Sequence, residues 1–274
     1  MAYKNILTIV TPEDASVAAP ALALAKRCEA GVTLASVAGG AMTPAFASGH
    51  FSGLAMTKAS GIANKHATEA AAAFEQAAKE AGVPVEISIV QDLLDRTGDQ
   101  LKQFAHVADL VVMAQPGEEP AFGEGYLLDT LLFGSGRPML LTPAGQGKAL
   151  KLGKVLVAWN DSAAAARAVG DALPLLRHAD AVEVVTINEG GVDFAEAAGH
   201  LVSHLRRHGI TASHRELDGA GRPVGEVLDG HARASGADLL VMGAYGRSRF
   251  REFVLGGATR TLLSRMSVPV FMAH

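Results

Sequence analysis

Short apolar runs rich in β-branched residues alternate along the chain with longer segments in which alanine is mixed with charged residues. The apolar runs have the length of strands, and the longer segments have the length and composition of helices. The predicted strands are residues 5–10, 31–37, 83–90, 108–113, 154–159, 181–187, 210–217, 237–242 and 268–272. The predicted helices are residues 15–30, 58–81, 99–107, 163–179, 193–208, 225–234 and 258–265. Strands that are apolar on both faces and separated by helices predict parallel sheets covered on both sides.

The same order of elements occurs twice, which indicates an internal repeat. The segment Ala108-Asp-Leu-Val-Val-Met113 recurs as Ala237-Asp-Leu-Leu-Val-Met242. The proline before the last apolar run of each copy recurs as Pro138 and Pro269. The first copy is about 20 residues longer, and we place the surplus in the glycine-rich stretch 39–61.

Two domains of one fold class follow from this repeat, at residues 1–145 and 153–274, joined by a polar linker. Each is predicted to be a doubly wound α/β unit with a parallel sheet of about five strands. The last strand, 268–272, is of a kind that often pairs across a two-fold axis. Such pairing would join either the two halves of one chain or two chains, and the sequence leaves both open.

Composition restricts the class of protein further. Apolar residues make up 49% of the 274 residues and charged residues 19%, which is a globular balance. The chain has no apolar run long enough for a membrane span and no signal-peptide pattern at its start. One cysteine excludes an internal disulfide, and a net charge of −4 gives no reason to expect nucleic-acid binding. We therefore expect a cytoplasmic protein that binds neither nucleic acid nor membranes.

The candidate for chemistry is the glycine-rich stretch that follows the strand 237–242. Gly243, Gly246, Gly256 and Gly257 precede a predicted helix, and five arginines fall between residues 247 and 265. Glycines let backbone amides turn toward a ligand, and a helix N-terminus favours an anion. These are the parts of a phosphate-binding loop, although a surface loop with solvated arginines has the same composition. The stretch matches neither the P-loop nor the G-x-G-x-x-G pattern.

The spacing of Gly243, Gly246 and Gly256 is the G-x2-G-x9-G pattern of the universal stress protein family. The surrounding run 237–248 and the terminal Ser-Val-Pro-Val-Phe also resemble that family, and the resemblance extends over both halves. It implies Rossmann-like domains paired about a two-fold axis, a role in stress tolerance, and binding of ATP or AMP, with Mg²⁺ accompanying ATP. The nucleotide-binding residues that it implies are Ala158, Asn160, Gly243, Gly246, Arg247, Gly256, Gly257, Ala258 and Thr259.

The second half departs from the family pattern at two positions. Gly257 stands where nucleotide-binding members usually carry Ser or Thr, and the missing hydroxyl contact would cost about 0.5–1.5 kcal/mol. Asn160 stands where the family tends to have Asp, and its amide can still accept and donate hydrogen bonds.

The first half departs much further from the pattern. Ala114 replaces the first glycine, and the stretch that follows carries Glu118, Glu119 and Glu124. These carboxylates would repel a triphosphate, so we expect no nucleotide in the first half.

Two rival functions remain open. One is a slow, Mg²⁺-dependent ATP hydrolase, in which Arg247 or Arg249 neutralises the phosphates. Against it, the loop offers no clear base and no acidic metal ligand beyond Glu252. The other is a dimerisation protein in which both nucleotide sites are vestigial, as Gly257 and Asn160 would suggest.

Other residues with reactive side chains are given structural interpretations. His200, His204 and His208 recur at helical spacing, but a solvated face is favoured over a metal site. Cys28 is interpreted as a helix-packing thiol, with neighbouring cations that could lower its pKa. Asp109 and Asp238 precede strands at the edge opposite the ligand end, where a capping role is favoured over catalysis.

Overall fold

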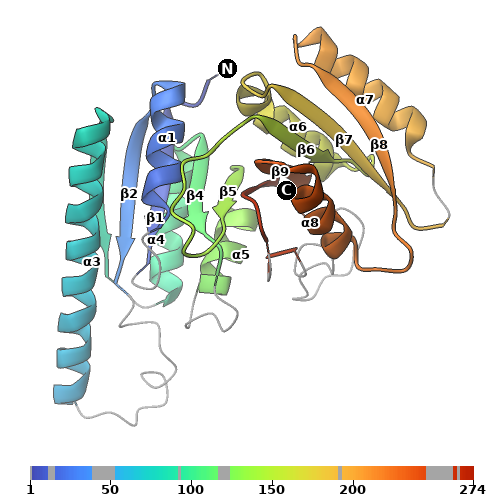
Figure 1. The fold of residues 1–274 in the computed structure, drawn as a ribbon. Coiled ribbons are helices and arrows are strands. Elements are labelled where there is room, and N and C mark those ends of the chain that lie inside the picture. Colours follow the sequence, from blue (N-terminus) through green and yellow to red (C-terminus); the bar gives the residue numbers. More distant parts are fainter. Residues whose placement is uncertain are drawn as a thin grey trace. The chain divides into compact units, whose positions relative to one another are not determined.

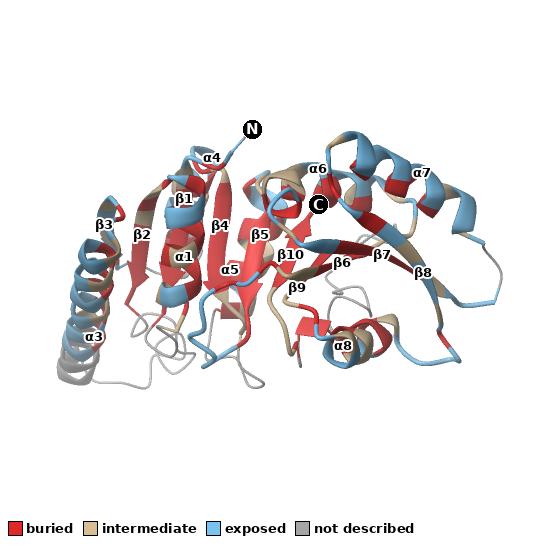
Figure 2. Cartoon of the chain, turned by 45° about the horizontal axis from the view of Figure 1, so that its top comes forward, coloured by how far each residue is buried: buried red, intermediate tan, exposed pale blue. Residues whose placement is uncertain are grey.

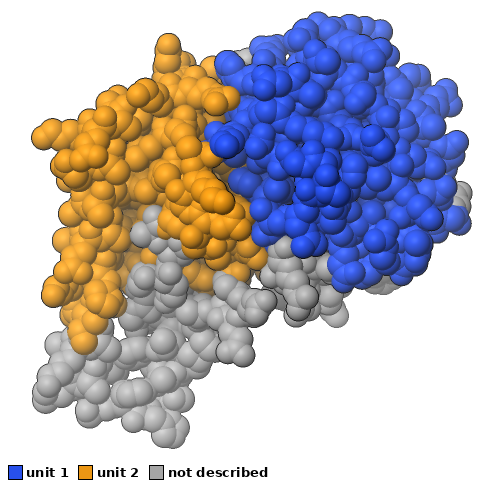
Figure 3. Space-filling view, in the orientation of Figure 1, with its two compact units in different colours: residues 1, 150–274 blue, residues 2–149 orange. Residues whose placement is uncertain are grey.

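The computed structural model describes residues 2–11, 16–38, 53–91, 94–116, 124–190, 193–244, 262–263 and 266–274. At residues 53–60 and 94–95 it describes the backbone alone. Two compact units make up the chain, residues 2–149 and 150–274 (Figure 3).

The first unit has a five-stranded parallel sheet in the order β3-β2-β1-β4-β5 (Figure 1). The chain therefore steps outward from β1 to one edge, returns, and steps outward to the other edge, which is the doubly wound order. The strands are β1 (Asn5–Val10), β2 (Gly31–Val37), β3 (Val85–Val90), β4 (Leu110–Ala114) and β5 (Met139–Thr142). The helices are α1 (Ala18–Cys28), α3 (Gly53–Ala81), α4 (Leu94–His106) and α5 (Glu124–Gly134).

The second unit repeats this arrangement with the strand order β8-β7-β6-β9-β10. Its strands are β6 (Lys154–Ala158), β7 (Ala181–Asn188), β8 (Ala212–Asp218), β9 (Leu239–Gly243) and β10 (Val270–Ala273). Its helices are α6 (Ala163–Leu176), α7 (Ala195–Arg207) and α8 (Val224–Ser235). The helix predicted at 258–265 lies mostly outside the described residues, although Leu262 and Leu263 are helical.

Helices cover the sheets on both sides. In the first unit α1 packs against α3 and α4 packs against α5, and in the second α7 and α8 lie on opposite sides of β6–β8 (Figure 2). The central strands are buried along almost their whole length, as in Ile6, Leu7 and Ile9 of β1. Residues buried on both faces explain why these strands read as continuous apolar runs. The predicted fold class, two tandem Rossmann-like domains, is confirmed.

An aspartate closes the amino edge of each sheet. Asp109 Oδ2 accepts hydrogen bonds from the backbone N–H groups of Lys4 and Asn5, at 2.7 and 3.0 Å. Asp238 Oδ2 does the same for Gly153 and Lys154, at 2.8 and 3.2 Å. Each aspartate thus ties the start of one strand to the start of its neighbour, which confirms the structural interpretation of both.

Candidate functional site

The candidate site lies where β6 and β9 of the second unit end. β6 lies between β7 and β9 in the sheet, and the connection after β6 runs to β7, whereas β9 is reached only later in the chain. The order of the strands therefore reverses between β6 and β9, and doubly wound sheets bind ligands at such a topological switch point. Ala158 is the last residue of β6 and is half-buried. The backbone N–H of Trp159 still donates to Val185 O, at 2.8 Å, so the sheet holds the chain in place up to the residue before Asn160.

A tight turn joins β6 to α6 and fixes the position of Asn160. Asp161 has a left-handed backbone with φ of 54°, a conformation that Asp tolerates better than most residues. Ser162 then caps α6 by accepting a hydrogen bond from the N–H of Ala165 at 3.1 Å. The turn therefore presents Asn160 and the N-terminus of α6 at the same edge of the sheet.

Two polar atoms at this edge are buried without a hydrogen-bond partner among the described residues. They are Asn160 Oδ1 and Trp159 Nε1, an acceptor and a donor. A buried polar atom left without a partner costs about 1–3 kcal/mol, so native proteins rarely leave one unpaired. The edge can therefore still hydrogen-bond a polar ligand, and the acceptor belongs to Asn160, one of the residues predicted to bind nucleotide.

Gly243 has a packing role that the sequence did not reveal. A Cβ atom on Gly243 would lie 2.4 Å from the backbone N of Ala165 and 2.5 Å from the backbone C of Ala164. The end of β9 thus runs directly against the first turn of α6, and only glycine fits there. The close packing explains this glycine whether or not a ligand binds nearby, and its contact with nucleotide stays a prediction.

The remaining predicted site residues lie outside the described part of the chain. They are Gly246, Arg247, Gly256, Gly257, Ala258 and Thr259, together with the other arginines between 247 and 265. Of the predicted nucleotide-binding residues, the structure therefore places Ala158, Asn160 and Gly243, and it brings all three to the carboxyl edge of one sheet.

The equivalent edge of the first unit is closed by an internal hydrogen bond. Thr11, directly after β1, donates from Oγ1 to Oε1 of Glu124 at 2.8 Å, and both residues are buried. Glu124 is the first residue of α5, so its carboxylate lies at the positive end of that helix. The chain's own carboxylate thus occupies the end of the helix where an anion would bind. Ala114 ends β4, while Glu118 and Glu119 lie outside the described residues.

Sequence reasoning predicted this Glu124 carboxylate to repel phosphate but missed its partner. The signal was available, because Thr11 follows the first strand and Glu124 precedes the last one. Polar residues in those two places converge on the carboxyl edge of a doubly wound sheet.

Cys28 is buried at the end of α1, with 6% of its surface exposed, which confirms the packing interpretation. Burial raises the pKa of its thiol, and the opposing effect of Arg27 and Lys4 is smaller. The neighbouring cations thus act in the expected direction, but the net shift of the pKa is upward, because desolvation of the thiolate outweighs their attraction.

This raised pKa predicts an unreactive thiol. At pH 7.5 the native chain should react with a disulfide reagent at least about tenfold more slowly than the same chain in denaturant, because less thiolate is present and it is covered. Release of the coloured thiol product, followed with and without 6 M guanidinium, measures this. Equal rates in the two conditions would contradict the buried placement of Cys28.

His204 and His208, in the last turn of α7 and at its C-cap, contact neighbouring side chains. The rings of His204 and His208 are 4.7 Å apart, and Nδ1 of His208 lies 3.2 Å from the Arg177 guanidinium. Within the described ranges, no three His, Cys, Asp or Glu side chains are grouped closely enough to hold a metal ion. His200 is exposed on the same helix, in agreement with a solvated face.

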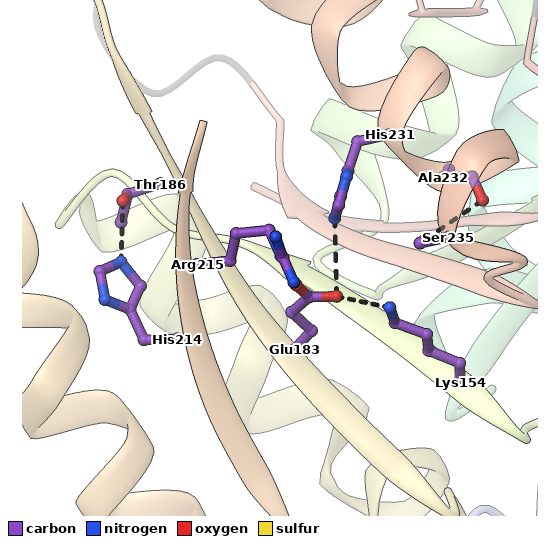
Figure 4. A network of polar contacts seen from close by, with 8 residues as sticks. All are labelled: Lys154, Glu183, Thr186, His214, Arg215, His231, Ala232 and Ser235. Carbon is purple, nitrogen blue, oxygen red and sulfur yellow. Dashed lines mark hydrogen bonds and ion pairs between the residues drawn. The ribbon is translucent and has the colours of Figure 1, made fainter. Parts of the chain in front are cut away.

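A polar network that sequence reasoning missed connects strands of the second sheet to α8 (Figure 4). Glu183 on β7 is buried, and it pairs with Lys154 at 2.6 Å, with Arg215, and with His231 at 3.5 Å. Burial by itself would raise the pKa of Glu183, but hydrogen bonds from Lys154 and Arg215 outweigh it and hold the pKa below its ordinary value. The network joins three strands and a helix, and it is a structural element and not part of the candidate site.

Comparisons with known proteins agree with the fold and with the family resemblance. The model of the universal stress protein family matches residues 151–274. A universal stress protein of Synechocystis is 27% identical over 194 residues, which is 65% of this chain and 63% of that protein. The chain thus spans less than two thirds of the length of this curated relative.

Solved structures show the same architecture across the whole chain. A universal stress protein from Archaeoglobus fulgidus superposes with a TM-score of 0.73 at 17% identity, over 98% of this chain and 95% of that one. A functionally unknown protein from Pseudomonas aeruginosa gives a TM-score of 0.59 at 13% identity, over 99% and 92%. None of the described helices is long and apolar enough to cross a membrane. On these matches, residues 151–274 carry a domain recognised as that of the universal stress protein family, and the chain as a whole is similar to proteins of that family.

Proposed function

We propose that the second unit binds an adenine nucleotide, ATP or AMP, at the carboxyl edge of β6 and β9, and that this binding serves a regulatory role in the stress response. The observation that carries the proposal is the buried Oδ1 of Asn160, which has no hydrogen-bond partner among the described residues at the switch point of the sheet. A ribose hydroxyl is a donor of the kind that such an oxygen needs.

The spacing of the glycines after β9 also supports the proposal. β9 ends at Gly243, at the same edge of the sheet as Asn160, and Gly246, Gly256 and Gly257 come after it in the sequence. Backbone amides in such a stretch, with Arg247 beside them, suit phosphate oxygens. The ribose contact and the phosphate contacts would thus come from the ends of two adjacent strands.

The first unit is proposed to bind no nucleotide. Glu124 already places a carboxylate at the N-terminus of α5, and Thr11, the counterpart of Asn160, donates its hydroxyl hydrogen to that carboxylate. A phosphate would have to lie beside this buried negative charge, which is strongly unfavourable in a poorly solvated site. We therefore expect one nucleotide per chain.

The only tryptophan of the chain offers a direct measurement. Trp159 is adjacent to Asn160, so titration with ATP or AMP should change its fluorescence, and calorimetry should give a stoichiometry of one. Titrations with and without Mg²⁺ show whether the ion accompanies ATP. No fluorescence change together with no heat of binding would refute the proposal.

Variants locate the site. Asn160→Leu removes one hydrogen bond to the ligand and should weaken binding about fivefold, which corresponds to about 1 kcal/mol. Gly246→Val should weaken it more, because a side chain would keep the backbone from approaching the phosphates. Thr11→Ser is the matched control, since it changes the equivalent residue of the first unit and keeps the hydroxyl. If this control weakens binding while Asn160→Leu does not, the nucleotide lies in the first unit.

A further inference from the structure

The exposed edge of the first sheet is unusually apolar. β3 is the outermost strand of its unit, and Ile87 and Ile89 are 38% and 39% exposed, with Val85 half-buried on the same face. These side chains alternate along the strand with Glu86 and Ser88, which point to the other face. An edge strand with exposed isoleucines is a surface on which another strand can pair.

The backbone N–H and C=O groups of Val85, Ile87 and Ile89 point away from the sheet, toward its free edge. Pro84 O accepts from the N–H of Val32 on β2, and Val90 O accepts from the N–H of Ala38, so the even-numbered residues bond to β2. The N–H and C=O groups of one strand residue point to the same side. The groups of Val85, Ile87 and Ile89 therefore point away from β2, and no described strand lies on that side.

The second unit shows that the fold does not require these isoleucines. Its outermost strand, β8, pairs with β7 as β3 pairs with β2, which makes His214 and Glu216 the counterparts of Ile87 and Ile89. His214 is bonded to Thr186 at 2.9 Å, and Glu216 is exposed. Polar and charged residues of this kind protect an edge against pairing. The β8 edge is thus protected, whereas the β3 edge is not.

The sequence of β3 is complementary to a reversed copy of itself. In an antiparallel pair centred on Ile87, Ile87 lies opposite its own counterpart and Val85 lies opposite Ile89. Glu86 then lies opposite Ser88, so the two carboxylates are kept apart. The outward-pointing residues are also the ones that such a pair would join by hydrogen bonds.

From this we infer that two copies of the chain associate through β3, strand against strand in antiparallel orientation, about a two-fold axis at Ile87. The interface is isologous, with the same strand contributed by each copy. Up to six backbone hydrogen bonds would form, two for each of the three residue pairs, and the exposed isoleucine faces would be covered. The site lies in the unit that is proposed to bind no nucleotide, and the inference does not depend on nucleotide binding.

Mass measurement over a range of concentrations tests the inference. Light scattering coupled to gel filtration should give a dimer for the unaltered chain and a monomer for Ile87→Lys, whose charges would face each other across the axis. The matched control is His214→Lys on β8, which should remain dimeric. A monomer for the unaltered chain at all concentrations, or an Ile87→Lys variant that stays dimeric, would overturn the inference.

Cross-linking gives a second readout that does not require loss of the dimer. Residues opposite each other in such a pair have Cα atoms about 5.5 Å apart, which is within reach of a disulfide. Ile87→Cys should therefore form a covalent dimer under mild oxidation, and His214→Cys should not. The native Cys28 is buried and should not interfere. Failure of Ile87→Cys to cross-link while the unaltered chain is dimeric would place the interface elsewhere.

Discussion

Gly243→Ala is expected to destabilise the second unit by about 3 kcal/mol. The added methyl would lie 2.4 Å from Ala165 N and 2.5 Å from Ala164 C, distances that Cβ atoms do not adopt. Both neighbours are backbone atoms of the first turn of α6, so no side-chain rotation can relieve the clash. Either β9 or the N-terminus of α6 must move, and both are held by the sheet and the helix cap.

Urea unfolding followed by Trp159 fluorescence measures this effect, because the only tryptophan reports on the second unit alone. A chain of two units can unfold in more than one step, so a local probe is needed. Gly170→Ala is the matched control. It lies in the middle of α6 with open space around its Cβ position, and it should stabilise the unit by about 0.5–1 kcal/mol. Equal unfolding midpoints for Gly243→Ala and the unaltered chain would contradict the close approach.

The fold was predictable because its strands are buried on both faces. β1 and β2 begin and end where the apolar runs do, at Asn5–Val10 and Gly31–Val37. In a parallel sheet covered on both faces, the side chains on either face of a strand are buried, so the apolar run in the sequence has the same ends as the strand. Because the sequence repeats, the fold predicted for the first half also predicted the fold of the second.

Helix boundaries were predicted less well where the sequence is polar or rich in glycine. α4 begins at Leu94, five residues before the predicted start at residue 99, and α5 (Glu124–Gly134) was not predicted at all. The segment before α5 is rich in Gly, Glu and Pro and hides the apolar spacing of the helix, in which Leu127, Leu128, Leu131 and Leu132 are buried. The helix is stabilised mainly by burial of these leucines in the folded unit, and less by the helix propensity of its residues.

The site was predictable only to the extent that topology places it. Gly243 ends β9 and Asn160 lies two residues after the end of β6, and strand order alone brings both residues to one edge of the sheet. The clash at Gly243 was beyond the sequence, because it depends on how closely α6 approaches β9. The Glu183 network was missed for a similar reason: one glutamate in an apolar strand gives no indication of partners from β6, β8 and α8.

Removing the Glu183 carboxylate should have the second large effect on stability. Glu183→Ala leaves Lys154, Arg215 and His231 around a cavity without their anion. The loss is expected to be about 2 kcal/mol at pH 7, which is below the usual cost of breaking a buried pair because Arg215 is 59% exposed and can turn to water. Glu216→Ala on β8, an exposed glutamate one strand away, should change stability by less than about 0.5 kcal/mol.

The pH dependence of that loss separates the charge from the cavity. The pKa of Glu183 is lower in the folded chain than in the unfolded one, so the unfolded state takes up a proton first as the pH falls. The stabilisation by this carboxylate is therefore fully present above its unfolded pKa and disappears as the pH falls through its folded pKa. In Glu183→Gln, which keeps the shape of the side chain, the difference in unfolding free energy from the unaltered chain should shrink steadily below about pH 4.5. Urea titrations at a series of pH values provide the comparison, and a difference that stays constant down to pH 3 would mean that packing, and not the ionised carboxylate, accounts for the effect.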